Sequence, residues 1–378
     1  MTSRRRFLAA AASAGGVGLA GCSDLLPGGG NGDGNGGDGD SPVGQIGSAR
    51  AGRGTPGGTS MEDMPPLEGE VTVYSGRSEV LVGDLVAYVQ DLYDDLTLDV
   101  RYLGANEAVN QIETAGQNSE ADVFFSVNAG ALGQLAEAGR TRPLHEDVAG
   151  LVREEFRDDD NRWIGTSGRA RTIPFNTEAF SGGDVPEDIL AFPDEDAFDG
   201  EMGWAPSYGS FQAFVTAMRL LEGEDTTRQW LQGMLDSGVQ RYPDEYQVCQ
   251  AIADGEITAG FTNHYYIQRV LDNRPDAPLE TAFTRGDAGA IFNVAGAAVV
   301  DSANDPEMAA NFVRHLLSGE AQDYFARTTF EYPLIPGVEP IGALPTIDEL
   351  NPPSDLDLTQ LSDLEPTIRL MRDAGVDV

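Results

Sequence analysis

The chain has 378 residues, and its 62 acidic side chains outnumber its 24 basic ones, which gives a formal net charge of −38 at pH 7. This charge excludes non-specific nucleic-acid binding as a role, because the phosphate backbone would be repelled. No lysine occurs and the acids are spread along the whole chain, a pattern typical of the salt-adapted surface of an extreme halophile's protein.

The first 22 residues have the pattern of an export signal that ends in a lipid-attachment site. Arg4 and Arg5 precede an uncharged stretch rich in Ala and Gly, which ends in Leu-Ala-Gly before Cys22. Paired arginines are typical of twin-arginine export, which carries folded proteins, and the last four residues are similar to a lipoprotein cleavage box. A membrane helix is the alternative, but the stretch is too short and too rich in Gly to span a bilayer. We therefore expect residues 1–21 to be a signal, with the protein held by lipid at Cys22 on the extracellular face of the cell membrane.

Residues 22–69 are expected to form a flexible acidic tether. They are rich in Gly, Asp, Pro and Ser and contain few large apolar residues, so burial could not offset the entropy lost on ordering. From residue 70 onward, strand-like and helical segments alternate. The predicted strands are 70–74, 96–102, 122–125 and 256–261. The predicted helices include one with Leu81, Leu85, Tyr88 and Leu92 on one face, 129–138, and one that starts at Asp305-Pro306 and stops at Gly319. This alternation indicates an α/β fold, and roughly 300 residues exceed what one core usually holds, so two lobes are expected.

Sequence signatures of catalysis are missing. The chain has no Gly-x-Ser-x-Gly, His-Glu-x-x-His, Cys-x-x-Cys or phosphate-loop motif. Cys249 lies in an apolar segment without a histidine at a catalytic spacing, so a buried apolar role is expected, and with Cys22 lipidated no intramolecular disulfide can form. We therefore expect a protein that is not an enzyme. An anchored hydrolase is the alternative, and it would need a nucleophile–base pair that the sequence does not reveal.

Tyr265 and Tyr266 form the most suggestive chemical pair. They follow the predicted strand 256–261, and ligands bind at the carboxyl ends of strands in α/β sheets. Phenol oxygens suit ferric iron, a hard cation that favours oxygen donors and can remove the phenol proton. Taken alone, a pair of tyrosines also fits a core or an interface.

The order and spacing of seven segments resemble the ferric-iron-binding proteins of ABC importers, within the two-lobe extracellular solute-binding class. The resemblance runs from about Val71 to Gly337 and is carried by residues 73–77 (VYSGR), 121–125 (ADVFF), 167–171 (SGRAR), 205–211 (APSYGSF), 263–266 (NHYY), 293–297 (NVAGA) and 331–334 (EYPL). It implies a type II periplasmic-binding-protein fold with a ligand cleft between the lobes. Lobe 1 would comprise residues 70–171 and 296–346, and lobe 2 residues 172–295 and 347–378. It also implies a monomeric receptor that delivers Fe(III) to an ABC permease and its ATPase.

The resemblance further implies a set of site residues. Tyr265 and Tyr266 would bind Fe(III) as phenolates, and Tyr208 is the candidate third ligand. A synergistic anion such as carbonate or phosphate would bind at the turn that opens the helix after Pro206. The residues implied for that anion are Arg77, Gly209, Ser210 and Asn263, with Asn128, Arg169 and Arg171 as further candidates. For the last two arginines, structural hydrogen bonding at the crossover between the lobes is the alternative.

The sequence departs from the family pattern in lobe 1. Relatives often supply a His after the first strand and a Glu after the strand at 122–125, whereas this chain has Arg77-Ser78 and Val127-Asn128 there. Tyrosines and an anion would then have to hold the iron. The alternative function is a receptor of the same fold for a small organic cation such as thiamine or a polyamine, with the three tyrosines forming a cation–π cage.

Overall fold

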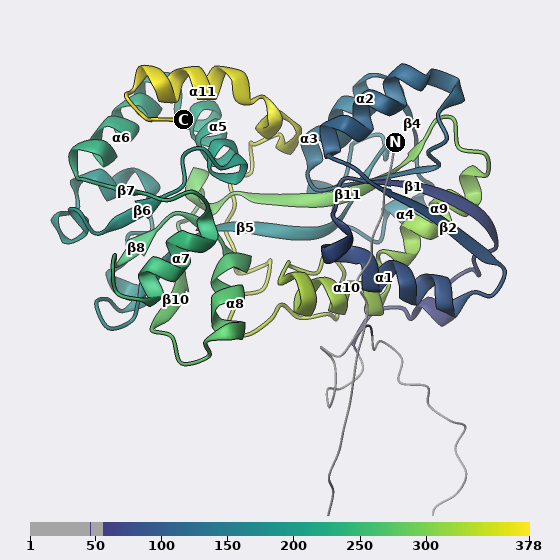
Figure 1. The fold of residues 1–378 in the computed structure, drawn as a ribbon, viewed down its shortest axis with the longest axis horizontal. Helices are drawn as coiled ribbons and strands as arrows, with labels where there is room; N and C mark the ends of the chain where they lie inside the picture. Colours follow the sequence, from purple (N-terminus) through teal and green to yellow (C-terminus); the bar gives the residue numbers. More distant parts are fainter. Residues whose placement is uncertain (1–45, 47–55) are drawn as a thin grey trace, which may run out of the picture. The chain divides into compact units, whose positions relative to one another are not determined.

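Two long antiparallel strands, β5 (Ile164–Asn176) and β11 (Phe292–Val300), run side by side through the middle of the fold and join two groups of helices (Figure 1). This computed structural model describes residue 46 and residues 56–378. The two strands pair from Phe292 with Ala170 to Ala297 with Ile164, with an irregularity between Ala295 and Gly296. A site between the groups is therefore bounded by two continuous strands.

The first group is built on a mixed sheet in the order β2-β1-β3-β11-β5. Strand β1 pairs in parallel with β2 and β3, and β11 pairs antiparallel with β3 on one side and with β5 on the other. The elements are β1 (Gly69–Ser75), α1 (Glu79–Leu92), β2 (Leu96–Tyr102), α2 (Ala105–Ala115), β3 (Val123–Ser126), α3 (Ala129–Glu137), β4 (Thr141–Arg142), α4 (Glu146–Ala149), α9 (Pro306–His315), α10 (Gly319–Tyr324) and a π-helix, η8 (Phe325–Thr329). Helices α2 and α3 lie on one side of the strands and α1 and α10 on the other (Figure 1).

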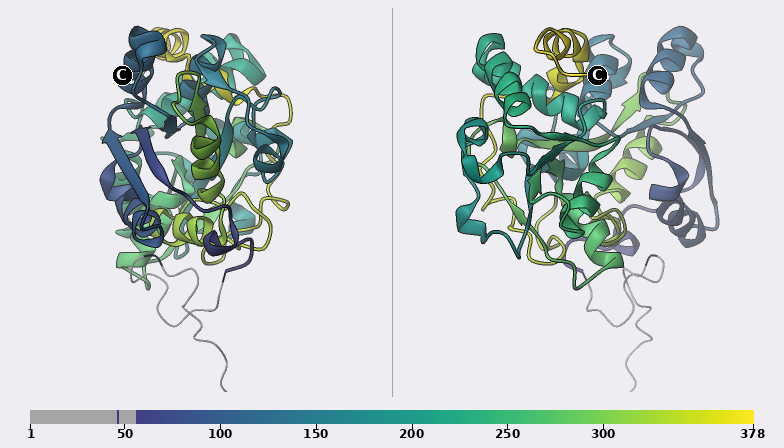
Figure 2. Two further views of the ribbon diagram at one scale, coloured as in Figure 1. Left: turned by 90° about the vertical axis from the view of Figure 1, so that its right-hand side faces the viewer. Right: turned by 60° about the vertical axis from the view of Figure 1, so that its left-hand side comes forward.

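The second group packs helices around short strands and an aromatic core. Its elements are β6 (Met202–Trp204), α5 (Gly209–Glu222), α6 (Glu224–Asp236), β7 (Gln240–Arg241), α7 (Glu245–Ala253), β8 (Ala259–Gly260), β9 (Thr262–Asn263), α8 (His264–Asn273), β10 (Leu279–Ala282), η9 (Leu358–Ser362) and α11 (Leu364–Asp373). Trp204, Phe211, Phe214, Trp230 and Phe261 pack ring against ring in its interior. Figure 2 shows helices on both sides of the strands when the fold is turned.

The buried apolar residues divide between separate cores. One draws on residue 46 and residues 61–170 and 292–338, a second on residues 173–261, 288–291 and 361–376, and a smaller third lies mainly under α7 and α8. The first core therefore takes strand β11 from a part of the chain that follows most of the second core, whose last residues, 361–376, come later still. This discontinuity is what the alternation of strands and helices could not reveal.

Several local predictions are confirmed and others are not. Asp305 caps α9 by accepting from the N–H groups of Glu307 and Met308, and Pro306 is the first helical residue, as predicted. Gly319, predicted as a helix stop, instead opens α10, because Ser318 accepts from Ala321 N–H as its cap. The predicted strand at 256–261 is reduced to Ala259–Gly260.

Residues 56–69, expected as the end of the tether, pack against the first core. Met61 and Leu67 are buried, and Ser60 Oγ donates to Glu320 Oε1 over 2.6 Å. The low average hydropathy of the segment hid these apolar anchors. The predicted signal, Cys22 and most of the tether lie outside the described residues. Among the residues that are described, the helices are too short or too polar to cross a bilayer.

Candidate functional site

A cavity of about 350 Å³ lies where the two groups of helices meet. Side chains and backbone from both groups line it: Asn106, Val127, Asn128, Arg169 and Asn293 on one side, Tyr208, Gly209, Ser210, Ala213, Asn263, Tyr265 and Ile291 on the other, and Leu361, Ser362 and Leu364 near the C-terminus. Among these described lining residues there is no Asp or Glu, although the chain carries 62 acids. The wall therefore offers phenols, amides and one arginine.

Three phenols are brought together at this cavity. Tyr265 and Tyr266 lie in the first turn of α8, directly after β9, and their ring centroids are 4.4 Å apart. Tyr208, which precedes α5, places its Oη 2.5 Å from Tyr266 Oη. Tyr265 Oη accepts from Asn263 Nδ2 over 3.2 Å. The pair is adjacent in the sequence, and the loop before α5 adds the third phenol through the hydrogen bond of Tyr208 to Tyr266.

Burial favours the protonated form of the Tyr265 and Tyr266 phenols. It raises the pKa of Tyr265 above that of a free phenol, and Arg169 nearby partly opposes the rise. Burial also raises the pKa of Tyr266 strongly, and the neighbouring Tyr265 adds to the shift. A bound cation would have to displace these protons. Within residues 46 and 56–378, no three His, Cys, Asp or Glu side chains gather to hold a metal, so the candidate ligands are phenol oxygens.

The N-terminus of α5 supplies backbone donors to the cavity wall. Tyr208 occupies the cap position but makes no side-chain cap hydrogen bond, so the N–H groups of Gly209 and Ser210 are not capped by it. Helix N-termini attract anions through such groups and the helix dipole. The Ser210 hydroxyl itself donates to Glu245 Oε1 over 2.6 Å, so this residue faces the cavity with its backbone rather than with a free hydroxyl.

Glu245 lies behind the cavity wall and is hydrogen-bonded to two of the lining residues, Ser210 and Asn263. Its carboxylate is fully buried at the start of α7 and accepts from the Asn263 N–H over 2.9 Å, from Ser210 and from Arg171. Arg171 is also buried and donates to Phe261 O over 2.8 Å. Arg171 belongs to β5, and its guanidinium makes these hydrogen bonds outside the cavity wall. Sequence reasoning did not predict these contacts of Glu245, because its partners come from three separate segments.

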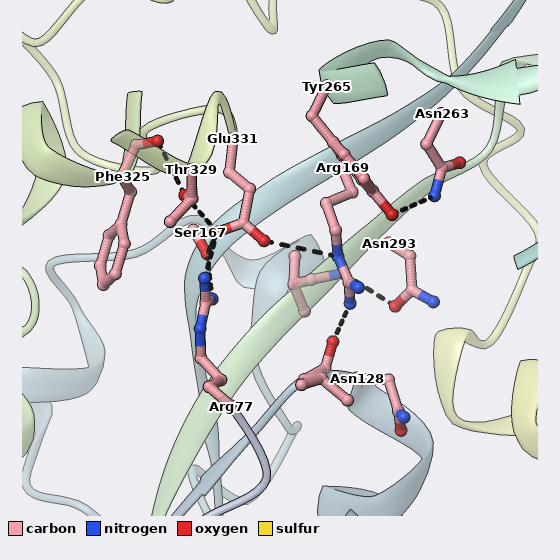
Figure 3. Close-up of polar contacts among 12 residues, drawn as sticks. Arg77, Asn128, Ser167, Arg169, Asn263, Tyr265, Asn293, Phe325, Thr329 and Glu331 are labelled. Atoms are coloured by element: carbon pink, nitrogen blue, oxygen red, sulfur yellow. Dashed lines mark hydrogen bonds and ion pairs between the residues drawn. The ribbon is translucent and has the colours of Figure 1, made fainter. Parts of the chain in front are cut away.

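Arg169 is the charged side chain that faces the cavity, and Glu331 backs it (Figure 3). The Arg169 guanidinium donates to Val127 O, and its Nε lies 4.0 Å from Glu331 Oε1. Glu331 also binds Arg77, whose Nη2 is 2.6 Å from Glu331 Oε2, and accepts from Ser167 over 2.8 Å. Burial alone would raise the pKa of Glu331, but Arg77 and Arg169 hold it below the usual range. The carboxylate is therefore ionised and fixes Arg169 at the cavity edge.

Arg77, predicted to bind the anion, lies elsewhere. Only 1% of its side chain is exposed, and it is absent from the cavity wall. Its guanidinium lies between the rings of Phe125 and Phe325, at 5.4 and 5.2 Å from their centroids. It can influence the cavity only through Glu331.

His264, between the strand and the tyrosines, has a structural role. Its Nδ1 accepts from the Ala170 N–H over 3.1 Å, and its Nε2 donates to Phe330 O over 2.7 Å, which fixes the neutral Nε2–H tautomer. Burial lowers its pKa to about 4, in spite of these two backbone hydrogen bonds. The ring thus pins the start of α8 to β5.

The structure brings seven of the ten predicted site residues other than Cys22 to the cavity wall: Tyr208, Tyr265, Gly209, Ser210, Asn263, Asn128 and Arg169. Tyr266 is not among the lining residues, but its hydroxyl is hydrogen-bonded to that of the lining residue Tyr208. Asn128 uses its side-chain oxygen to cap α3, accepting from the Ala131 N–H over 2.9 Å, so its amide nitrogen remains for the cavity. Arg77 and Arg171 lie outside the wall, and Cys22 lies outside the described residues.

Comparison with known proteins agrees with this architecture. Residues 85–350 match the family model described as bacterial extracellular solute-binding protein. The major ferric iron-binding protein of Neisseria meningitidis serogroup A is 30% identical over 322 residues, which are 82% of this chain and 94% of that protein. Iron uptake protein A2 of Synechocystis is 30% identical over 286 residues, 72% of this chain and 81% of that protein. Iron-bound HitA from Pseudomonas aeruginosa has the same fold, with a TM-score of 0.70 at 27% identity over 82% of this chain and 100% of that one. The predicted two-lobe, type II fold is confirmed, and the chain belongs to the bacterial extracellular solute-binding protein family.

Proposed function

We propose that this protein is the Fe(III) receptor of an ABC importer, that it binds its cargo between the lobes without catalysing a reaction, and that it delivers the cargo to a permease and its ATPase. One observation carries the proposal. The phenols of Tyr208 and Tyr265 line a cavity whose described wall contains no carboxylate, and Tyr266 contacts both of them. The names of the relatives, which refer to ferric iron and iron uptake, support the same cargo.

Phenolates would provide the charge that this cargo needs. Ferric iron favours hard oxygen donors, and three phenolates would offset its three positive charges. Side chains from lobe 1 contribute amides and Arg169 rather than anionic oxygens. We therefore propose that an anion such as carbonate or phosphate completes the coordination. It would be held by the N–H groups of Gly209 and Ser210, by Asn263 and Asn128, and by Arg169, while Arg77 acts only through Glu331.

The same wall argues against the rival cargo, a small organic cation. A cation–π cage of neutral phenols gains affinity from nearby carboxylates, and the described lining has none. Arg169 and the N-terminus of α5 both add positive potential. This arrangement suits a cation that arrives with its own anion.

We also propose the location that the sequence pattern implies. The signal at 1–21 and Cys22 would place the protein, exported by the twin-arginine route and lipid-anchored, on the extracellular face of the membrane as a monomer. The lobe limits predicted from the sequence, 70–171 with 296–346 and 172–295 with 347–378, are part of this proposal. An Arg4→Lys/Arg5→Lys variant should stay in the cytoplasm, and a Cys22→Ser variant should appear in the medium. Normal membrane anchoring of both variants would contradict the assignment.

Titration with ferric citrate at high salt tests the cargo. We expect saturable binding of one iron per chain and a visible phenolate-to-iron charge-transfer band. The Tyr265→Phe/Tyr266→Phe variant should lose both signals, whereas Tyr102→Phe on β2, outside the cavity, should keep them. If the wild-type protein shows neither the band nor saturable iron, Fe(III) is not its cargo. Retention of thiamine or spermidine by the protein during dialysis at high salt would then support the organic-cation receptor.

A further inference from the structure

A short segment near the C-terminus reaches from the second group of helices to the first. The 3-10 helix η9 (Leu358–Ser362) leads directly into α11, which is fixed on the second group: Thr367 Oγ1 lies 2.8 Å from Thr216 Oγ1 of α5, and Arg219 Nε donates to Thr367 over 3.2 Å. The segment η9 nevertheless contacts α3 of the first group as well as α5 (Figure 1). It is therefore carried by one lobe and docked on the other.

The docking surface on α3 is open only because two of its residues are glycines. A Cβ atom built on Gly130 would lie 1.5 Å from Ser362 Oγ and 2.3 Å from Ser362 Cβ. A Cβ atom on Gly133, one turn along the same helix, would lie 2.6 Å from Thr359 Cγ2 and 2.7 Å from Thr359 Cβ. Contacts this short do not occur, so any larger residue would displace η9. Glycine in a helix interior costs about 1 kcal/mol relative to alanine, yet α3 carries two.

Leucines of the same segment connect this docking to both cores and to the cavity. Leu358 packs against the first and the second core, and Leu361 is 2% exposed and belongs to the second. Leu361, Ser362 and Leu364 also form part of the cavity wall. The three residues therefore form the part of the cavity wall that is continuous with the docked segment.

We propose that η9 is a latch that holds the lobes closed and retains the cargo, with Gly130 and Gly133 as its seat and Ser362 and Thr359 as the seated residues. This inference rests on the proposed function for its cargo, but not for its mechanics. Lobe opening is a hinge motion around the crossing strands, and α11 ties η9 to lobe 2. Opening must therefore lift η9 off α3 and uncover the cavity. The stability of the contact between η9 and α3 sets the rate at which bound cargo dissociates.

The two close approaches permit a clash-and-rescue test in the full-length protein. Gly130→Ala places a methyl group where Ser362 now lies, and Ser362→Gly removes the two atoms that would lie within 3.0 Å, which leaves Thr359 O at 3.1 Å. Gly133→Ala and Thr359→Gly form a second, independent pair. The matched control is Gly83→Ala on α1, where the nearest atom to the added methyl would be the flexible Glu79 Cγ at 3.3 Å.

Iron dissociation, followed as loss of the charge-transfer band into excess chelator, should be roughly tenfold faster in Gly130→Ala and in Gly133→Ala. The double variants Gly130→Ala/Ser362→Gly and Gly133→Ala/Thr359→Gly should restore most of the wild-type rate. The dissociation rate of Gly83→Ala should equal that of the wild type. Melting temperatures report whether each variant is folded. Rates that stay at the wild-type value in both glycine variants, or that neither partner substitution corrects, would overturn the latch.

Small-angle scattering of the iron-free protein separates the latch from the cargo assignment. The glycine variants should have a larger radius of gyration than the wild type, and the double variants should return to the wild-type value. If the wild-type protein binds no iron, the proposed function fails while this comparison still decides the latch. If iron binds but neither the scattering nor the dissociation rate responds, the latch fails and the proposed function stands.

Discussion

Arg77 and Glu331 form an ion pair shut off from solvent, in which Arg77 Nη2 lies 2.6 Å from Glu331 Oε2. The partners are separated by 254 positions in the chain, one after the first strand of the fold and the other after the π-helix η8. Ser167 and Thr329 donate to the same carboxylate oxygen, over 2.8 and 2.9 Å. A buried carboxylate this well satisfied behaves as a fixed part of the scaffold.

Removing that carboxylate charge should destabilise the fold. Glu331→Gln leaves Arg77 buried without a counter-ion, so the free energy of unfolding should fall by about 3–5 kcal/mol, as is typical when one partner of a buried pair is lost. Glu120→Gln, which breaks the exposed pair with Arg101, should cost less than about 1 kcal/mol. Denaturant unfolding at high salt measures both values. Equal, small effects would mean that the Arg77–Glu331 pair does not stabilise the fold.

Iron loading should release one proton for each phenol that coordinates. Burial holds the pKa of Tyr265 and of Tyr266 above the ordinary phenol value, so both side chains are protonated at neutral pH and the metal must displace their protons. Binding should therefore weaken as the pH falls. A pH-stat titration with ferric nitrilotriacetate in weak buffer should show a proton count that drops by one in Tyr208→Phe, Tyr265→Phe and Tyr266→Phe. An unchanged count in Tyr208→Phe would exclude Tyr208 as a ligand.

The thiol of Cys249 should be inert in the folded protein. The side chain is fully buried on α7, and burial raises its pKa well above the ordinary thiol value, so little thiolate forms near neutral pH. In a Cys22→Ser background, Ellman's reagent should react slowly with the native protein and with one thiol per chain after unfolding. Rapid native labelling would show that α7 opens readily.

Acidification should destabilise the protein through His315. Burial lowers the pKa of this side chain to about 4, whereas an unfolded histidine titrates near 6.5. Between these values the unfolded chain binds a proton that the folded chain does not, so stability is present above about pH 6.5 and is lost as the pH falls toward 4, by at most about 3 kcal/mol. His315→Gln should flatten this part of the plot of unfolding free energy against pH. His145→Gln, at an exposed position, is the matched control.

Low salt should destabilise the wild-type protein. A net charge of −38 makes the folded chain repel itself, and mobile cations screen that repulsion. The melting temperature should rise steadily when KCl is increased from 0.1 M to about 3 M. A melting temperature independent of salt would contradict the halophilic interpretation of the composition.

Local sequence rules predicted the elements whose contacts are local. The predicted strands 70–74 and 96–102 match β1 and β2 to within one residue, and the predicted helical face from Leu81 to Leu92 lies within α1, because a short hydrophobic run and an amphipathic helical period are complete signals in themselves. The pair Tyr265–Tyr266 was found for the same reason, since it lies at the end of a short strand. The helix cap at Asp305 needed only its own neighbours.

The features that the sequence did not predict depend on contacts between residues that are far apart in the chain. Nothing within ten residues of Arg77 indicates Glu331, so the arginine could be assigned to a bound anion as easily as to a buried ion pair. The contacts of Glu245 could not be predicted because its partners Arg171, Ser210 and Asn263 come from three separate segments. The segment η9 carries no ligand-type residue, and its place beside the cavity depends on glycines more than 200 positions earlier.

Strand β11 has a consequence for how the chain acquires its structure. It completes the sheet of the first group by pairing with β3 and β5, yet it is synthesised only after nearly all of the second group. The first lobe therefore cannot finish folding on the ribosome until about residue 300 has emerged, and the high contact order of this topology predicts slow folding. Such a late-closing sheet is suited to an export route that carries folded chains, as proposed above for this protein.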